Sequence, residues 1–313
     1  MKDKLTILVP LKDRSEYTKR FMSKSNDKKC PFKILLADGG GDVDIENHLK
    51  EYANYPNLNY EYFRCPFDST FGHFYKKMKN AVDKIETPYI CSLDNDDWFE
   101  VDGMTECVSI LDKENYSSAR GSLCASDGSN IWSTYRDDIT GNTGVDRIID
   151  QSKHFHSNWH NVMHTKIAKI CWSIIEILNP TNFRFVEQTN CYIPVVFGNS
   201  HRGDFPWVHH RRGERIETEN GSLANHFPNQ KTWINSNYWP ENFNKMTEAV
   251  GVVISYVDNI SVYEAMEKFR SAYPYKLPHL SDLLTDRINY AKSLGYNKER
   301  IDKMKEIVHQ YSV

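Results

Sequence analysis

The sequence predicts an α/β fold in which a mostly parallel sheet is flanked by helices, followed by an α-helical C-terminal extension. Short apolar segments typical of strands alternate with helical segments through the N-terminal part of the chain. Two of the strand segments end in aspartate-containing loops. From about residue 241 the apolar residues keep helical spacing, which favours a run of helices at the C-terminal end.

Four strands are expected at the start of the chain, at residues 5–9, 32–37, 58–63 and 88–92. Pro10 follows the first strand, and three glycines follow Asp38 at the end of the second. Glycines permit tight turns and a close approach of a ligand to the backbone. In open sheets of this kind ligands bind beyond the carboxyl ends of the strands, so these loops are the expected ligand side.

Helices are expected after each of these strands, joined by right-handed crossovers. The clearest is 71–85, where apolar residues recur at three- and four-residue steps. Further along, 122–126 and 131–135 are predicted to form a hairpin added to the sheet, and 140–150 is expected to be a loop. The segment 183–189 is expected to precede another helix.

Histidines cluster between residues 154 and 164, with His156, His160 and His164 spaced as on one helix face. A helix there would indicate a zinc site. The surrounding residues equally suit a strand that leads into the apolar helix 165–178, and a strand would separate the histidines. We favour the strand.

The composition is that of an ordinary globular protein of 313 residues, with a formal net charge of −3. This charge gives no support to nucleic-acid binding. No apolar run is long enough for a membrane helix, and the N-terminus has no signal-peptide pattern. Seven scattered cysteines favour reduced thiols. We therefore expect a cytoplasmic protein, with peripheral contact to the inner face of the membrane as a further option.

The segment from Leu93 to Trp98 is the strongest candidate for a functional site, because three aspartates occupy four positions after a strand. Carboxylates this close repel one another, and a hard divalent cation that takes oxygen ligands would offset the repulsion. If the strand stays extended, Asp94 and Asp96 project to one side and Asp97 to the other. The alternative is an acidic turn that caps the following helix.

Four segments together resemble the GT-A fold of family 2-type inverting glycosyltransferases over roughly residues 4–213. They are the first strand with its loop (7–14), the Asp38-Gly39-Gly40 turn, the helical Lys77–Ala81 segment, and the Asp94–Asp97 segment, which is similar to the Asp-x-Asp motif of that family. Each segment is weak alone, and their order and spacing carry the resemblance.

The resemblance implies a role for each matching residue. The residues expected to bind the nucleotide-sugar donor are Pro10, Leu11, Lys12, Arg14, Asp38, Lys77, Asp94, Asn95 and Arg211. The ligands expected for Mn²⁺ or Mg²⁺ are Asp94, Asp96 and a late histidine, His209 or His210, of which we favour His210. Glu187 is expected to be the base that deprotonates the acceptor hydroxyl. Gln188 departs from the Glu-Asp pair that is common in the family, which leaves the identity of the base open.

The resemblance implies a metal-dependent inverting glycosyltransferase of polysaccharide biosynthesis. The expected domains are a GT-A domain at 1–213 and a mainly helical extension at 214–313. The expected partners are a nucleotide-sugar, with a UDP-sugar preferred, a glycan or glycolipid acceptor, and a second copy in a homodimer. Two alternatives stay open: a non-catalytic glycan-binding or scaffolding protein on a decayed fold, and a nucleotidyltransferase, which the glycine-free loop 11–14 disfavours.

Overall fold

The computed structural model describes residues 3–126, 131–134, 137–155, 157, 159–211 and 229–311. The strands are β1 (Leu5–Leu11), β2 (Lys33–Asp38), β3 (Asn59–Arg64), β4 (Tyr89–Ser92), β5 (Trp98–Phe99), β6 (Tyr116–Ser126), β7 (Ile131–Thr134), β8 (Val162–His164) and β9 (Asn199–Arg211). The helices of the N-terminal part are α1 (Ser15–Asp27), α2 (Val43–Lys50), α3 (Phe71–Asp83) and α4 (Val101–Lys113). They are followed by α5 (Gly144–Lys153), α6 (Thr165–Leu178), α7 (Phe183–Phe197), α8 (Gln230–Asn235), α9 (Trp239–Asp258), α10 (Val262–Ala272), α11 (Ser281–Ser293) and α12 (Lys298–Tyr311). Short 3₁₀ turns are η1 (Tyr52–Asn54), η2 (Tyr273–Lys276) and η3 (Pro278–Leu280).

Within the described residues, the strands form one mixed sheet in the order β3-β2-β1-β4-β8-β6-β9-β5, with β7 paired to β6. The first four strands run parallel, as the alternation of strands and helices predicts. Strand β8 is antiparallel to both β4 and β6, while β6 and β9 are parallel. The GT-A-like α/β fold expected from the sequence is therefore confirmed.

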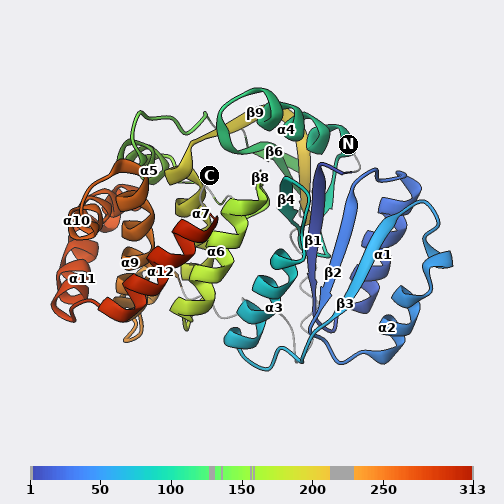
Figure 1. The fold of residues 1–313 in the computed structure, drawn as a ribbon, viewed down its shortest axis with the longest axis horizontal. Coiled ribbons are helices and arrows are strands. Elements are labelled where there is room, and N and C mark those ends of the chain that lie inside the picture. The colour runs from blue at the N-terminus through green and yellow to red at the C-terminus, as the bar shows by residue number, and fades with distance from the viewer. Residues whose placement is uncertain are drawn as a thin grey trace.

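Both faces of the sheet are covered, which explains the apolar character of its first strands. Successive residues of a strand point to opposite faces. Ile7 and Val9 of β1 accordingly join the core beside α1, α2 and α4, while Leu8 joins the core beside α3 and α6. Figure 1 shows the two layers, with α1 and α2 on one side of the sheet and α6, α7 and the C-terminal helices on the other.

The structure confirms the predicted hairpin, since β6 and β7 pair antiparallel. It corrects two other predictions. The segment 140–150 is not a loop throughout, because α5 begins at Gly144 behind a capping box made by Thr143 and Asp146. The segment 183–189 does not precede a helix but begins one, so Glu187 lies inside α7.

The helices from α8 to α12 share one apolar core with α3, α6 and α7. The buried Glu248 of α9 fixes the last helix, because its carboxylate accepts hydrogen bonds from the Nε and Nη2 groups of Arg300 at 2.5 and 2.9 Å. The predicted domain boundary at 213/214 lies outside the described residues and stays a prediction. None of the described helices is both long and apolar enough to cross a bilayer.

A buried ion pair between Asp68 and Lys77 holds the loop after β2 in place. The Nζ of Lys77 also donates a hydrogen bond to the carbonyl oxygen of Leu11 at 3.0 Å. Gly39 makes room for this pair, because a Cβ there would lie 2.4 Å from the carboxyl carbon of Asp68. The backbone of Asp68 is held next to Gly39, because the N–H of Asp68 donates a hydrogen bond to the carbonyl oxygen of Gly39 at 2.9 Å.

Replacing Gly39 with Ala is therefore expected to lower the free energy of unfolding by about 1–3 kcal/mol, the usual cost of overpacking a tight site. Urea denaturation would measure it. The matched control is Gly41→Ala, whose added Cβ would meet its nearest neighbour at 3.7 Å, an ordinary contact. That variant should change the free energy by less than about 0.5 kcal/mol. Equal effects of the two substitutions would contradict this account of Gly39.

Candidate functional site

The residues predicted to bind the donor through the first loop gather at the carboxyl ends of β1 and β2. Pro10 and Leu11 are the last residues of β1 and pair with Ala37 and Asp38 of β2. The Nζ of Lys12 donates to the carbonyl oxygen of Asp68 at 2.7 Å. This loop therefore sits beside the turn that follows β2, as the sequence predicts.

Asp38 is almost fully buried at the end of β2. Its Oδ2 accepts hydrogen bonds from the hydroxyl of Tyr62 at 2.7 Å and from Arg64 at 2.9 Å, and its Oδ1 accepts from the N–H of Gly40 at 2.7 Å. These hydrogen bonds hold the carboxylate at the end of the strand. Lys77 was expected to bind the donor, but its ammonium is buried against Asp68 and the carbonyl oxygen of Leu11. It therefore stabilises the loop.

The acidic segment does not continue the extended strand. Strand β4 ends at Ser92, and the N–H of Asp97 donates to the carbonyl oxygen of Asp94 at 3.2 Å, which closes a turn. Side chains no longer alternate between two sides in a turn, so Asp94 and Asp97 converge instead of Asp94 and Asp96. The carboxylate of Asp96 instead accepts a hydrogen bond from Arg14 at 2.8 Å.

The third member of the site is His160, which precedes β8. One ligand atom from each of Asp94, Asp97 and His160 lies within 4.8 Å of the others. Asp96 is outside this group, and among the described residues no such group includes His154 or His164. His156 lies outside the described residues, so the zinc site considered for the histidine cluster stays untested there, while β8 confirms the preferred strand.

The backbone carbonyl of Ser92 orients the ring of His160. Its oxygen lies 2.9 Å from Nδ1, so Nδ1 donates and Nε2 faces Oδ2 of Asp97 at 3.3 Å. Burial acts to lower the pKa of His160, but the hydrogen bond and charge of Asp97, helped by Asp94, outweigh it and raise this pKa to about 9. Without a bound cation, His160 is therefore itself positively charged near neutral pH.

The donor set of the group suits Mn²⁺. Two carboxylates supply oxygen ligands, which Mg²⁺ and Mn²⁺ both accept, and an imidazole adds a nitrogen ligand, which Mn²⁺ accepts more readily than Mg²⁺ does. A metal-binding histidine normally donates its other ring N–H to a carbonyl or carboxylate, and His160 already does so to Ser92.

Asn95 and the late histidines take supporting positions. The amide of the buried Asn95 donates to Thr18 at 3.0 Å. The Nε2 of His209 lies 2.8 Å from the carboxylate of Glu100, and its ring stacks on Trp98. The backbones of His210 and Arg211 pair with β6, while their side chains are outside the described residues, so their expected roles stay predictions.

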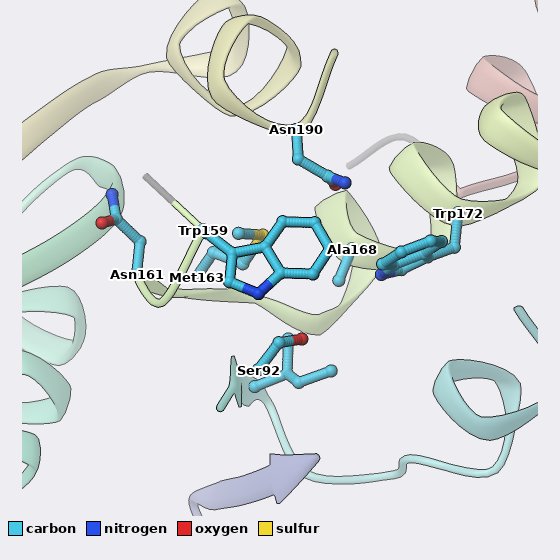
Figure 2. A pocket seen from close by; sticks show the side chains of 8 residues that line it. Ser92, Trp159, Asn161, Met163, Ala168, Trp172 and Asn190 are labelled. Carbon is cyan, nitrogen blue, oxygen red and sulfur yellow. The ribbon is translucent and has the colours of Figure 1, made fainter. Parts of the chain in front are cut away.

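The loop that carries His160 is anchored by Trp159. Figure 2 shows the indole of Trp159 among Ser92, Ala168, Trp172 and Asn190. The cavity lined by these residues measures only about 10 Å³ and holds at most one water molecule. It is therefore a packing site that ties the loop to β4, α6 and α7, and not a ligand pocket.

Glu187 lies in a different cavity, of about 210 Å³, which is lined by residues of α7, α8 and η2 together with Phe155, Ser157 and Leu277. Burial and the nearby charge of Asp94 raise the pKa of Glu187 to about 7. Gln188 lines the same cavity, and its Oε1 accepts a hydrogen bond from Tyr273 at 2.7 Å. Gln188 is therefore occupied in holding α7 to η2.

The fold defined by this sheet and its helices is the GT-A-like α/β class. No family model matches the chain, and no curated protein sequence matches it. Solved structures of TarS from S. aureus are similar to it in fold. One covers 98% of this chain and 52% of the TarS chain, with a TM-score of 0.59 at 13% sequence identity. This chain thus spans about half the length of that TarS chain.

Two structures of TarS residues 1–349 hold ligands. The complex with UDP-GlcNAc covers 98% of this chain and 80% of its own, with a TM-score of 0.56 and 13% identity. The complex with UDP also covers 98% of this chain and 91% of its own, with a TM-score of 0.55 and 16% identity. At this identity the likeness establishes the fold.

Sequence reasoning missed three residues that shape the site: Asp68, Asp97 and His160. An extended strand would place the side chain of Asp97 on the side opposite to Asp94 and Asp96, so the pattern does not predict Asp97 as a metal ligand. His160 was considered only within its own cluster. A signal for the turn was present, since the sequence Asp-Asn-Asp-Asp has the residues that favour turns over strands.

Replacing Asp97 with Asn is expected to weaken Mn²⁺ binding by about tenfold or more, because it removes a ligand charge and the partner of His160. Electron paramagnetic resonance of free Mn²⁺ during titration would measure the affinity. The matched control is Asp96→Asn, the same chemical change one residue away, which should leave Mn²⁺ affinity nearly unchanged. Loss of Mn²⁺ binding in Asp96→Asn with retention in Asp97→Asn would show that the ligand set is wrong.

Proposed function

We propose that this protein is a metal-dependent inverting glycosyltransferase that moves a sugar from a nucleotide-diphosphate sugar, preferably a UDP-sugar, to a hydroxyl of a glycan or glycolipid. The observation that carries the proposal is the convergence of Asp94, Asp97 and His160 at the carboxyl end of β4. The likeness in fold to TarS, which has been crystallised with UDP-GlcNAc and UDP, supports the choice of donor.

The donor would lie across the carboxyl ends of β1, β2 and β4. Asp38 and the loop of Lys12 and Arg14 would border the nucleoside end. Asp94, Asp97 and His160 would hold Mn²⁺ at the diphosphate end. A divalent ion held there stabilises the negative charge that develops on the leaving phosphate.

Glu187 would act as the base. Its carboxylate takes the proton of the acceptor hydroxyl while the acceptor oxygen bonds to the anomeric carbon and the bond from that carbon to the phosphate oxygen breaks, releasing the nucleoside diphosphate. A general base works best when its pKa lies near the working pH, and burial has moved Glu187 into that range.

A thermal-shift panel of UDP, GDP, CDP and dTDP sugars tests the donor. UDP-GlcNAc with Mn²⁺ is expected to raise the midpoint of unfolding, because a ligand that binds only the folded state stabilises it by mass action. The shift should vanish without metal and in Asp97→Asn, and it should persist in Glu306→Gln, a change at an exposed carboxylate far along the chain. No shift with any nucleotide sugar would favour the decayed, glycan-binding alternative.

Replacing Glu187 with Gln is expected to lower kcat by about 10²–10⁴-fold while the thermal shift with donor persists, because the amide cannot accept the proton. In the unsubstituted protein kcat/KM should rise with pH up to about 7 and then level off, since Glu187 acts only when ionised and its pKa lies at about 7. A profile that is flat from pH 5 to 8, or full activity in Glu187→Gln, would assign the base elsewhere.

A further inference from the structure

The cavity of Glu187 also holds a lysine, which brings a positive charge to the candidate base. Lys276, at the end of η2, lines the same cavity of about 210 Å³. Its Nζ lies 3.6 Å from the ring centroid of Phe155 and 5.9 Å from that of Tyr273. A cation is attracted to the face of an aromatic ring, so these rings fix the position of the ammonium.

The turn that carries Lys276 is attached to α7 beside Glu187. The hydroxyl of Tyr273, the first residue of η2, donates to Oε1 of Gln188 at 2.7 Å, and Gln188 directly follows Glu187. The buried ring of Tyr273 also lies against that of Tyr192, further along α7, with the ring centroids 6.3 Å apart. These contacts hold η2 on α7 and keep the ammonium and the carboxylate in one cavity.

The charges that act on Glu187 come from four segments. Burial and the charge of Asp94, in the acidic turn, raise the pKa of Glu187 to about 7. Three positive charges lower this pKa. In order of decreasing effect they are Lys276 of η2, Arg184 of α7 and His160 before β8. Lys276 is therefore the positive charge that most favours the ionised carboxylate.

The influence between the two side chains is mutual. Burial lowers the pKa of Lys276 to about 7, while Cys191 and Glu187 act to raise it. Taking a charged group out of water costs free energy, which an opposite charge nearby offsets in part. Glu187 and Lys276 therefore each favour the charged form of the other.

We propose that Lys276 is a positioning residue for the transfer reaction: its ammonium, held on the ring of Phe155, keeps the carboxylate of Glu187 ionised and able to take the proton of the acceptor hydroxyl. The inference rests on the proposed transferase function, since Lys276 has this task only if Glu187 is the base. The proton still passes from the acceptor oxygen to Glu187, and Lys276 acts through its charge alone.

Replacing Lys276 with Met tests the proposal, because it removes the charge and keeps a long side chain. The rising limb of kcat/KM is expected about one pH unit higher, since a carboxylate that loses a nearby positive charge is harder to ionise. Near pH 7 kcat/KM should fall about fivefold, and near pH 9 it should recover. Loss by the same factor at every pH would show a merely structural role and overturn the proposal.

Two variants serve as controls. Lys276→Arg keeps the charge and should leave the rising limb near pH 7. Lys153→Met makes the same change at an exposed lysine that is not among the lining residues of the cavity, although its Nζ also lies near an η2 ring, 5.8 Å from the centroid of Tyr275. Its pH profile should be unchanged. If Lys276→Met does not fold, Lys276→Gln takes its place. A profile of Lys276→Arg that matches the neutral variant, or an equal change in Lys153→Met, would overturn the proposal.

Carbon NMR of the metal-free protein with ¹³C-labelled glutamate measures the ionisation of Glu187 without turnover. The signal of Glu187 is assigned by its absence in Glu187→Gln. Its titration midpoint is expected near pH 7 in the unsubstituted protein and about one pH unit higher in Lys276→Met.

The thermal shift with UDP-GlcNAc and Mn²⁺ is measured on the same proteins. A donor shift with an unmoved NMR midpoint in Lys276→Met leaves the transferase function standing and overturns the role of Lys276. A moved midpoint without any donor shift removes the transferase function, and with it the reaction that Lys276 would serve. The two failures are therefore distinguishable.

Discussion

The site depends on the point at which β4 stops. The carbonyl of Ser92, the last residue of that strand, accepts from Nδ1 of His160 instead of continuing the ladder, and the next residues fold into a turn closed between Asp94 and Asp97. One strand end thus orients the imidazole and bends the acidic segment towards it. Without that end, the two carboxylates and the imidazole would lie apart, and the candidate metal group at the carboxyl end of β4 would not form.

The fold could be predicted from sequence because it depends on local periodicity. Ile7, Leu8 and Val9 alternate between two covered faces, and the spacing of Phe71, Tyr75 and Met78 indicates a helix, so each element is visible in a short window. The site was predicted only in part for the same reason. The local acidic pattern indicates Asp94 as a site residue. The contact between Asp97 and His160 joins residues far apart in the chain, so no local pattern in the sequence predicts it.

The C-terminal helices contribute to the site as well as to the core. The segment η2 follows α10 directly and brings Lys276 into the cavity of Glu187, while the hydroxyl of Tyr273 holds Gln188 of α7. In the sequence, Gln188 departs from the Glu-Asp pair that is common in the family it resembles. In the structure it is a buried hydrogen-bond partner, and this contact fixes the turn of α7 from which Glu187 projects.

The charges of the acidic group and of the Glu187 cavity act on one another. Asp94 raises the pKa of Glu187 and helps to raise that of His160, so one carboxylate influences both the candidate base and the candidate metal ligand. Any cation that neutralises Asp94 would remove part of the repulsion on Glu187 and favour its ionised form. A cation bound by the candidate metal group would thus make Glu187 a stronger candidate base. The charge of Asp94 therefore couples the candidate metal group to the protonation of Glu187.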